Sequence, residues 1–174
     1  MRNFFKPAYY YPDVFSIAPE SLKERGIKLM LLDMDNTLVS AVETHIPEYV
    51  KNYVQAVKRA GIKPVVMSNN ISDITEKRCR QLDIDFFSFC VKPLKFGYKK
   101  ILRKYGFTPE ETAAVGDQVL TDIAGANRMG ILTILVDPLS NDNNIFGKGV
   151  KLISRSLCRL LKDMPRKGEY YGEL

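Results

Sequence analysis

Short apolar runs alternate with longer amphipathic stretches along this chain, and that alternation constrains the fold more than any other feature. Several of the runs are dense in Val, Ile, Leu and Phe, which is typical of strands buried in a parallel sheet. The five predicted strands span residues 28–32, 64–67, 86–91, 112–115 and 131–136.

The amphipathic stretches between these runs have the character of helices. They cover residues 47–60, 72–82, 98–105 and 120–129. Gly61, Gly106 and Gly130 follow three of them, at the position where glycine commonly ends a helix. Strands that alternate with helices form right-handed βαβ units. We therefore predict an α/β fold with an open, mostly parallel five-stranded sheet and helices on both faces.

The length of 174 residues suffices for one hydrophobic core without disulfides or a structural metal. We predict a single domain over residues 1–174 with its core at about 28–136. An aromatic segment, 1–26, precedes that core, and it either covers the core or rests at a membrane interface. A basic amphipathic helix is predicted at about 150–163, either as a solvated outer face or as a weak membrane attachment. Its cations at helical spacing are Lys151, Arg155, Arg159 and Lys162.

Composition excludes several classes of protein. No apolar run approaches the roughly 20 residues that cross a bilayer, and the first residues lack the apolar core of a secretory signal, so a cytoplasmic location is expected. Cys79, Cys90 and Cys158 form no CxxC pair, which favours reduced thiols. Because His45 is the sole histidine, catalysis must rest on carboxylates. The formal net charge of +6 favours anionic partners without choosing among them.

The strongest chemical signal is the segment LMLLDMDNTLV, in which an apolar strand runs into Asp33 and Asp35. A carboxylate at the strand end can attack phosphorus, provided that cations neutralise the crowded negative charge. A second carboxylate two residues later can protonate the leaving alcohol and then activate water. The alternative is an ordinary strand-to-loop turn with solvated aspartates.

Three further polar residues follow other apolar runs: Ser68, Lys92 and Asp117. In open α/β sheets, ligands bind at the carboxyl ends of the strands. One edge of the predicted sheet therefore collects these residues and Asp33, although they are far apart in the sequence.

The segment Asp33-Met34-Asp35-Asn36-Thr37-Leu38 resembles the first signature of the haloacid dehalogenase superfamily, in its DxDxT phosphatase form. The resemblance implies that Asp33 is the nucleophile, Asp35 the acid/base, and Thr37 part of the phosphate site. Ser68, followed by Asn69, resembles the second signature, where a hydroxyl binds the transferring phosphoryl group. Outside this context a serine before a helix is more often only a cap.

Two later segments complete the resemblance. Lys92, in CVKPLKFGYKK, resembles the third signature, whose ammonium stabilises the phosphate and the nucleophile; Lys95 is the rival that we disfavour. GDQVLTDIAGAN resembles the fourth, with Asp117 as a direct magnesium ligand. Asp122 either binds the metal through water or orients Lys92.

The implied metal site joins Asp33, Asp117 and the backbone carbonyl of Asp35 around Mg²⁺. Neither the gap from Asp33 to Ser68 nor that from Ser68 to Lys92 can hold a large cap domain. An open cleft suits a phosphate on a large substrate.

Within the capless group, the chain is similar to the bacterial family that includes phosphatidylglycerophosphate phosphatases. That similarity implies hydrolysis of phosphatidylglycerophosphate to phosphatidylglycerol by an enzyme peripheral to the inner face of the membrane. Two alternatives remain: a soluble phosphatase for a phosphoprotein, nucleotide or sugar phosphate, and a nucleic-acid-binding or ribosome-assembly factor. Nothing in the sequence resembles an RNA-binding motif, so nucleic acid is not an expected partner.

Overall fold

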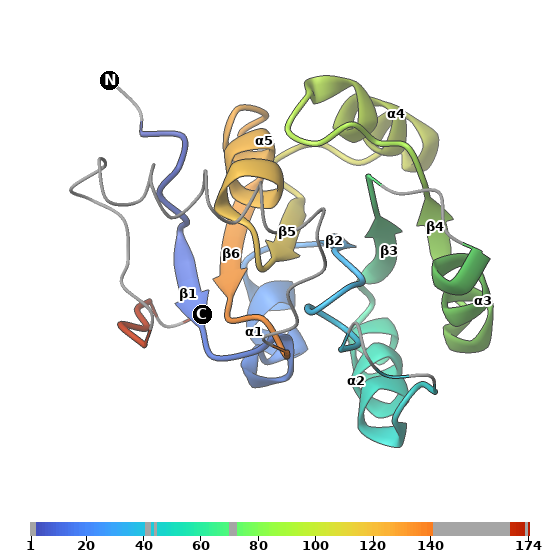
Figure 1. The fold of residues 1–174 in the computed structure, drawn as a ribbon. Coiled ribbons are helices and arrows are strands. Elements are labelled where there is room, and N and C mark those ends of the chain that lie inside the picture. The colour runs from blue at the N-terminus through green and yellow to red at the C-terminus, as the bar shows by residue number, and fades with distance from the viewer. Residues whose placement is uncertain (1–2, 41–42, 44, 70–72, 141–167, 173) are drawn as a thin grey trace.

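Six parallel strands form one open sheet in the computed structural model, which describes residues 3–40, 43, 45–69, 73–140, 168–172 and 174 (Figure 1). The strand order is β1-β6-β5-β2-β3-β4, and each neighbouring pair is parallel. The strands are β1 (Tyr9–Tyr11), β2 (Leu29–Leu32), β3 (Lys63–Met67), β4 (Asp85–Phe87), β5 (Thr112–Gly116) and β6 (Leu132–Val136).

Helices connect the strands in the predicted alternation. They are α1 (Pro19–Glu24), α2 (Glu48–Arg59), α3 (Asp73–Leu82), α4 (Lys95–Tyr105) and α5 (Ala124–Asn127), with a 3₁₀ turn at Val14–Ser16 and a π-helical turn at Val119–Ile123. The predicted helix 120–129 is therefore wrong as a regular α-helix. Its first turn is widened, because the backbone N–H of Ile123 bonds to the carbonyl of Gln118, five residues earlier.

The sheet separates two layers of helices, as predicted. Met30 and Leu32 of β2 pack in one cluster with residues of α1, α2 and α3. Leu29 and Leu31 point to the other face and pack in a second cluster with residues of α4 and α5. This alternation is the two-residue period of a strand that is buried on both faces. In Figure 1, α4 and α5 lie on the opposite side of the sheet from α1 and α2.

The prediction of five strands is one short. The additional strand, β1, comes from the aromatic N-terminal segment and pairs in parallel with β6, in the register Tyr10↔Leu135. Tyr10 is buried, and Tyr171 joins it through an antiparallel bridge. Three consecutive tyrosines favour a strand, but the run is too short and too polar at its phenol groups to stand out in an apolar-run analysis.

The predicted strand 86–91 is wrong beyond Phe87, where β4 ends. Phe89 and Val91 have φ angles of 52° and 50°, which a strand cannot contain. Lys92 therefore lies in a loop and does not follow the strand directly.

The predicted basic helix at 150–163 and Cys158 lie outside the described residues. Cys79 and Cys90 are buried and form no disulfide, as expected. Among the described residues, no helix is long and apolar enough to cross a membrane.

Candidate active site

Two aspartates meet where adjacent strands β2 and β5 end. Asp33 follows Leu32 directly, and its backbone N–H donates to the carbonyl of Val115 at 3.0 Å. Because Leu32 is in register with Val115, Asp33 is level with Gly116, and Asp117 comes one residue later. The sheet thus brings Asp33 and Asp117 to the same carboxyl edge, where ligands of open α/β folds bind.

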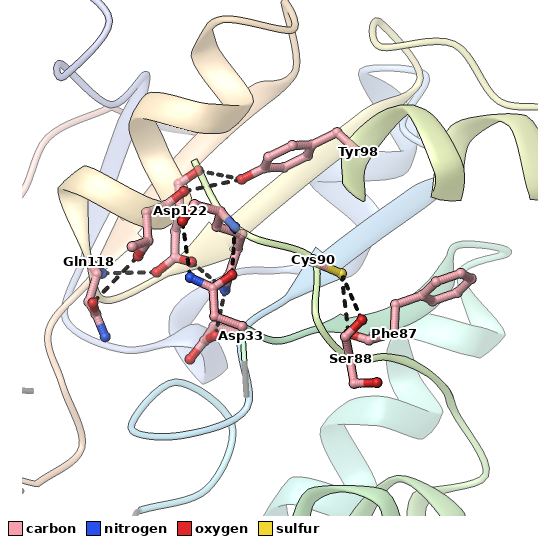
Figure 2. A network of polar contacts seen from close by, with 10 residues as sticks. Asp33, Phe87, Ser88, Cys90, Tyr98, Gln118 and Asp122 are labelled. Atoms are coloured by element: carbon pink, nitrogen blue, oxygen red, sulfur yellow. Dashed lines mark hydrogen bonds and ion pairs between the residues drawn. The ribbon is translucent and has the colours of Figure 1, made fainter. Parts of the chain in front are cut away.

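A buried cation joins two carboxylates at this edge (Figure 2). The Lys92 Nζ lies 2.6 Å from Oδ1 of Asp33 and 2.6 Å from Oδ1 of Asp122. The three side chains are 6%, 13% and 4% exposed, respectively. Burial alone would lower the pKa of Lys92, but the Asp122 and Asp33 carboxylates raise it above its usual range. Lys92 is therefore held as an ammonium beside the predicted nucleophile, whereas Lys95 is exposed at the start of α4.

Asp122 is held by backbone groups as well as by Lys92. Its Oδ2 accepts from the N–H of Gln118 at 3.1 Å, and the Tyr98 hydroxyl donates toward the Asp122 carbonyl at 3.3 Å (Figure 2). A Cβ on Gly116 would lie 2.4 Å from Cγ of Asp122, so glycine is required for this close approach. Burial raises the pKa of Asp122, while Lys92 and the Gln118 N–H oppose that rise. The structure places Asp122 where it orients Lys92, one of the two roles left open by the sequence.

Asn69 fastens the loop that carries Lys92. Its Nδ2 donates to the Lys92 carbonyl at 3.0 Å, and the Lys92 backbone N–H donates to its Oδ1 at 2.5 Å. Asn69 thus contacts the backbone of Lys92, and its predicted contact with the phosphate stays a prediction. Ser68, at the end of β3, is buried and bonded through its backbone to Phe87 and Cys90, and its phosphate contact also stays a prediction.

Arg78 is a residue of the site that the sequence reasoning missed. Its Nη1 lies 3.2 Å from Oδ1 of Asp35, and its Nη2 donates to the backbone oxygen of Glu43. The Arg78 side chain is 8% exposed. It lies on the buried face of α3 with Cys79 and Leu82, and a charge on an otherwise buried helix face was the available signal.

The environment of Asp35 favours its protonated form. Burial and the Asp33 carboxylate raise the pKa of Asp35, against the opposing effects of Arg78 and Lys92. The side chain is still 43% exposed, so it can exchange protons with a substrate or with water. A carboxyl with a raised pKa is suited to a general acid.

Thr37 is fully buried in the turn after Asp35. That turn is closed by the Asn36 N–H, which donates to the Val39 carbonyl at 2.8 Å, with Asn36 at φ 63°. Among the described residues, the Thr37 hydroxyl has no hydrogen-bond partner. The geometry does not link Thr37 to Lys92 or Asp122, so its predicted role in phosphate binding is not established.

The donor set at this edge fits a hard divalent cation. Asp33 and Asp117 offer carboxylate oxygens, and the described residues include no cluster of three or more His, Cys, Asp or Glu side chains of the kind that forms an all-protein metal cage. Mg²⁺ needs no such cage, because it keeps several waters and takes one or two carboxylates together with substrate oxygens.

Residues 39–130 match the family described as haloacid dehalogenase-like hydrolase. A relative described as probable phosphatase YqeG, from Bacillus subtilis (strain 168), is 31% identical over 173 residues and covers 99% of both chains. The family match begins after Asp33 and Asp35, whereas the Bacillus alignment extends over nearly the whole chain.

A plant relative and a solved structure add to these findings. Phosphatidylglycerophosphate phosphatase 1, chloroplastic/mitochondrial, of Arabidopsis thaliana is 28% identical over 96% of this chain, which spans only 50% of the plant protein. The cobalt-bound deoxy-D-mannose-octulosonate 8-phosphate phosphatase of Haemophilus influenzae has a TM-score of 0.51 at 21% identity, over 74% of this chain and 77% of that one. The structural likeness shows the shared fold.

Proposed function

Because this chain belongs to the haloacid dehalogenase-like hydrolase family and is a phosphatase of that family, we propose that it transfers the phosphoryl group of a monoester to Asp33 and then to water. The observation that carries this proposal is the buried Lys92 ammonium, 2.6 Å from both Asp33 and Asp122. A fixed cation beside the nucleophile stabilises the negative charge that gathers there in the transition state.

Asp33 and Asp35 divide the reaction into two displacements. First, an Asp33 oxygen attacks phosphorus, the bond from phosphorus to the ester oxygen breaks, and Asp35 gives its proton to that oxygen. Then Asp35 takes a proton from water, the water oxygen attacks phosphorus, and the bond to Asp33 breaks, which releases inorganic phosphate. The raised pKa of Asp35 supports the first step, because that step needs the protonated acid.

We assign Mg²⁺ to the edge between β2 and β5. Asp33, Asp117 and the backbone carbonyl of Asp35 would hold it. When bound, the ion offsets the charge of the phosphate and polarises its oxygens. Asp122 supports this site indirectly, through Lys92.

We further propose that the substrate is phosphatidylglycerophosphate and that the enzyme works at the inner face of the membrane. The relation to the Arabidopsis protein supports this choice. So does the formal net charge of +6, which favours an anionic lipid surface. Between Asp33 and Lys92 the sheet strands are joined by α2 and α3, with no inserted cap among the described residues.

The test measures phosphate release from phosphatidylglycerophosphate in mixed micelles and from a panel of soluble phosphate esters, with Mg²⁺ and with a chelator. Asp33→Asn should abolish turnover, and Asp35→Asn should lower it by about 10²–10⁴-fold. Asp13→Asn is the matched control, because Asn can keep the cap that Asp13 makes to Ser16.

Three other outcomes are informative. Soluble turnover without lipid turnover would keep the mechanism and remove the lipid substrate. Full activity of Asp33→Asn would contradict the mechanism. The absence of any turnover would favour the binding-factor alternative.

A further inference from the structure

We propose that the loop after β4 and the outer face of α4 form a docking surface that seats the active site on an anionic lipid bilayer. The inference rests on the proposed function, because its purpose is to present a lipid phosphate to Asp33. The docking surface comprises Phe89, Val91, Leu94, Phe96, Lys99, Lys100 and Arg103.

The apolar part of the docking surface is unusually dense. Phe89, Val91, Leu94 and Phe96 are 66%, 38%, 54% and 66% exposed, within eight consecutive residues. Single exposed apolar side chains are common on protein surfaces. Four of them gathered in one segment indicate a surface that meets another apolar phase.

The backbone fixes this outward presentation. Phe89 and Val91 both have positive φ, which costs a non-glycine residue on the order of 1–3 kcal/mol. Between and after them, Cys90 and Lys92 point inward and are 3% and 8% exposed. The Cys90 N–H donates to the Ser68 carbonyl at 3.1 Å, so the loop is anchored to the end of β3.

The basic part of the docking surface comes from α4, which carries no acidic residue. Relative to Phe96, the cations Lys99, Lys100 and Arg103 lie three, four and seven positions later, which places all four residues on one helix face. That face is opposite the buried residues Tyr98 and Ile101. Among the described residues, these three cations form no ion pair.

An aromatic side chain surrounded by unpaired cations matches an anionic bilayer better than it matches a protein partner. Phe enters the interface, while Lys and Arg bind the lipid phosphates, each with a favourable contribution near the surface. A second copy of this chain would instead bring its own basic face against these cations.

The position of Lys92 links the docking surface to the reaction. Lys92 lies between Val91 and Leu94 in sequence, and its Nζ reaches Asp33 at 2.6 Å. A bilayer against Phe89 and Phe96 therefore places lipid headgroups beside the catalytic edge. The lipid phosphate can enter without its acyl chains leaving the membrane.

The test is co-sedimentation of the full chain with vesicles of phosphatidylcholine alone and of phosphatidylcholine with phosphatidylglycerol. The native chain should bind the anionic vesicles preferentially. The double variant Phe89→Ser/Phe96→Ser and the triple variant Lys99→Gln/Lys100→Gln/Arg103→Gln should each bind them at least about tenfold more weakly. Tyr49→Ser on α2 is the matched control, because Tyr49 is a 51% exposed aromatic residue outside the docking surface.

Activity and oligomeric state separate the possible results. Both multiple variants should keep native thermal unfolding and native turnover of a soluble aryl phosphate, and lose turnover of phosphatidylglycerophosphate in vesicles. Unchanged vesicle binding in both would overturn the docking surface, and persistent lipid turnover would then leave the proposed function standing. A native dimer that the double variant converts to monomer, without loss of vesicle binding, would also overturn it.

Discussion

Arg78 Nη1 lies 3.2 Å from Oδ1 of Asp35, and the Arg78 side chain is almost completely buried beneath that carboxyl. Its second nitrogen donates to the Glu43 backbone oxygen, so the guanidinium is fixed at two points. A planar guanidinium with two fixed contacts orients a carboxyl in a way that a flexible ammonium does not. We therefore regard Arg78 as a positioning residue for the proposed acid.

Replacement of Arg78 should impair the first displacement in a way that depends on the leaving group. Arg78→Met should lower kcat for alkyl phosphates, which need a proton from Asp35, by about 10²-fold, and should affect aryl phosphates much less. Arg78→Lys should recover only part of the loss. Steady-state kinetics on both ester classes checks this, and an equal loss on both would assign Arg78 a purely structural role.

Lys92 should contribute to stability as well as to catalysis. Lys92→Met leaves Asp33 and Asp122 buried without their cation, so the free energy of unfolding should fall by about 3–5 kcal/mol. Lys92→Met/Asp122→Asn removes one of the stranded carboxylates and should recover much of that loss without recovering activity. Denaturant unfolding of the three proteins tests this, and a double variant no more stable than Lys92→Met would contradict it.

Gly116→Ala should disturb the site through a direct clash. The new Cβ would lie 2.4 Å from Cγ of Asp122, so the carboxyl must move away from Lys92, and turnover should fall at least about tenfold. Gly130→Ala is the control: Gly130 has φ 79° with no atom within 4 Å of the added Cβ. It should lose about 1–2 kcal/mol of stability and keep its turnover. Comparable turnover in both variants would argue against the clash.

Asp85 should make folding stability depend on acid pH. The hydrogen bond from Tyr105 and the contact with Lys63 hold the pKa of Asp85 below its ordinary value. Its stabilising effect is therefore present above the unfolded pKa of about 3.9 and is lost as pH falls through the lower folded value.

Asp85→Asn measures that contribution. At neutral pH it should reduce the free energy of unfolding by less than about 1 kcal/mol, because the Asp85 side chain is 44% exposed and screened by solvent. Urea titrations at neutral pH and near pH 3 should show the difference only at neutral pH. Tyr105→Phe should weaken the pH dependence. An equal loss at both values of pH would rule out the carboxylate as its cause.

The buried strands could be predicted from the sequence, but the short strands at the edges could not. β2, β3, β5 and β6 lie within one residue of their predicted bounds, because strands covered on both faces must be apolar throughout. At the edges, β1 is three tyrosines and β4 is a half-buried tripeptide. The apolar run at 86–91 was misleading because Phe89 and Val91 face solvent.

The catalytic edge was predictable where motif and topology coincide. Asp33 and Asp117 follow neighbouring buried strands, so the order of the strands alone brings them together. The contacts that hold them depend on the tertiary arrangement: Asn69 fixes the backbone of Lys92, and Arg78 reaches Asp35 from α3. No local spacing relates residues 23 or 43 positions apart.

The pairing of β1 with β6 has a consequence for the order of folding. Ala8 donates to the Thr133 hydroxyl across 125 residues, and Tyr10 bridges to Tyr171. Contacts at such separation form late, because a long loop must close first. Pulse-labelled hydrogen exchange during refolding should protect the amide of Leu32 before that of Tyr10. The first strand to leave the ribosome is thus the last to join the sheet, and its tyrosines stay without a neighbour through most of synthesis.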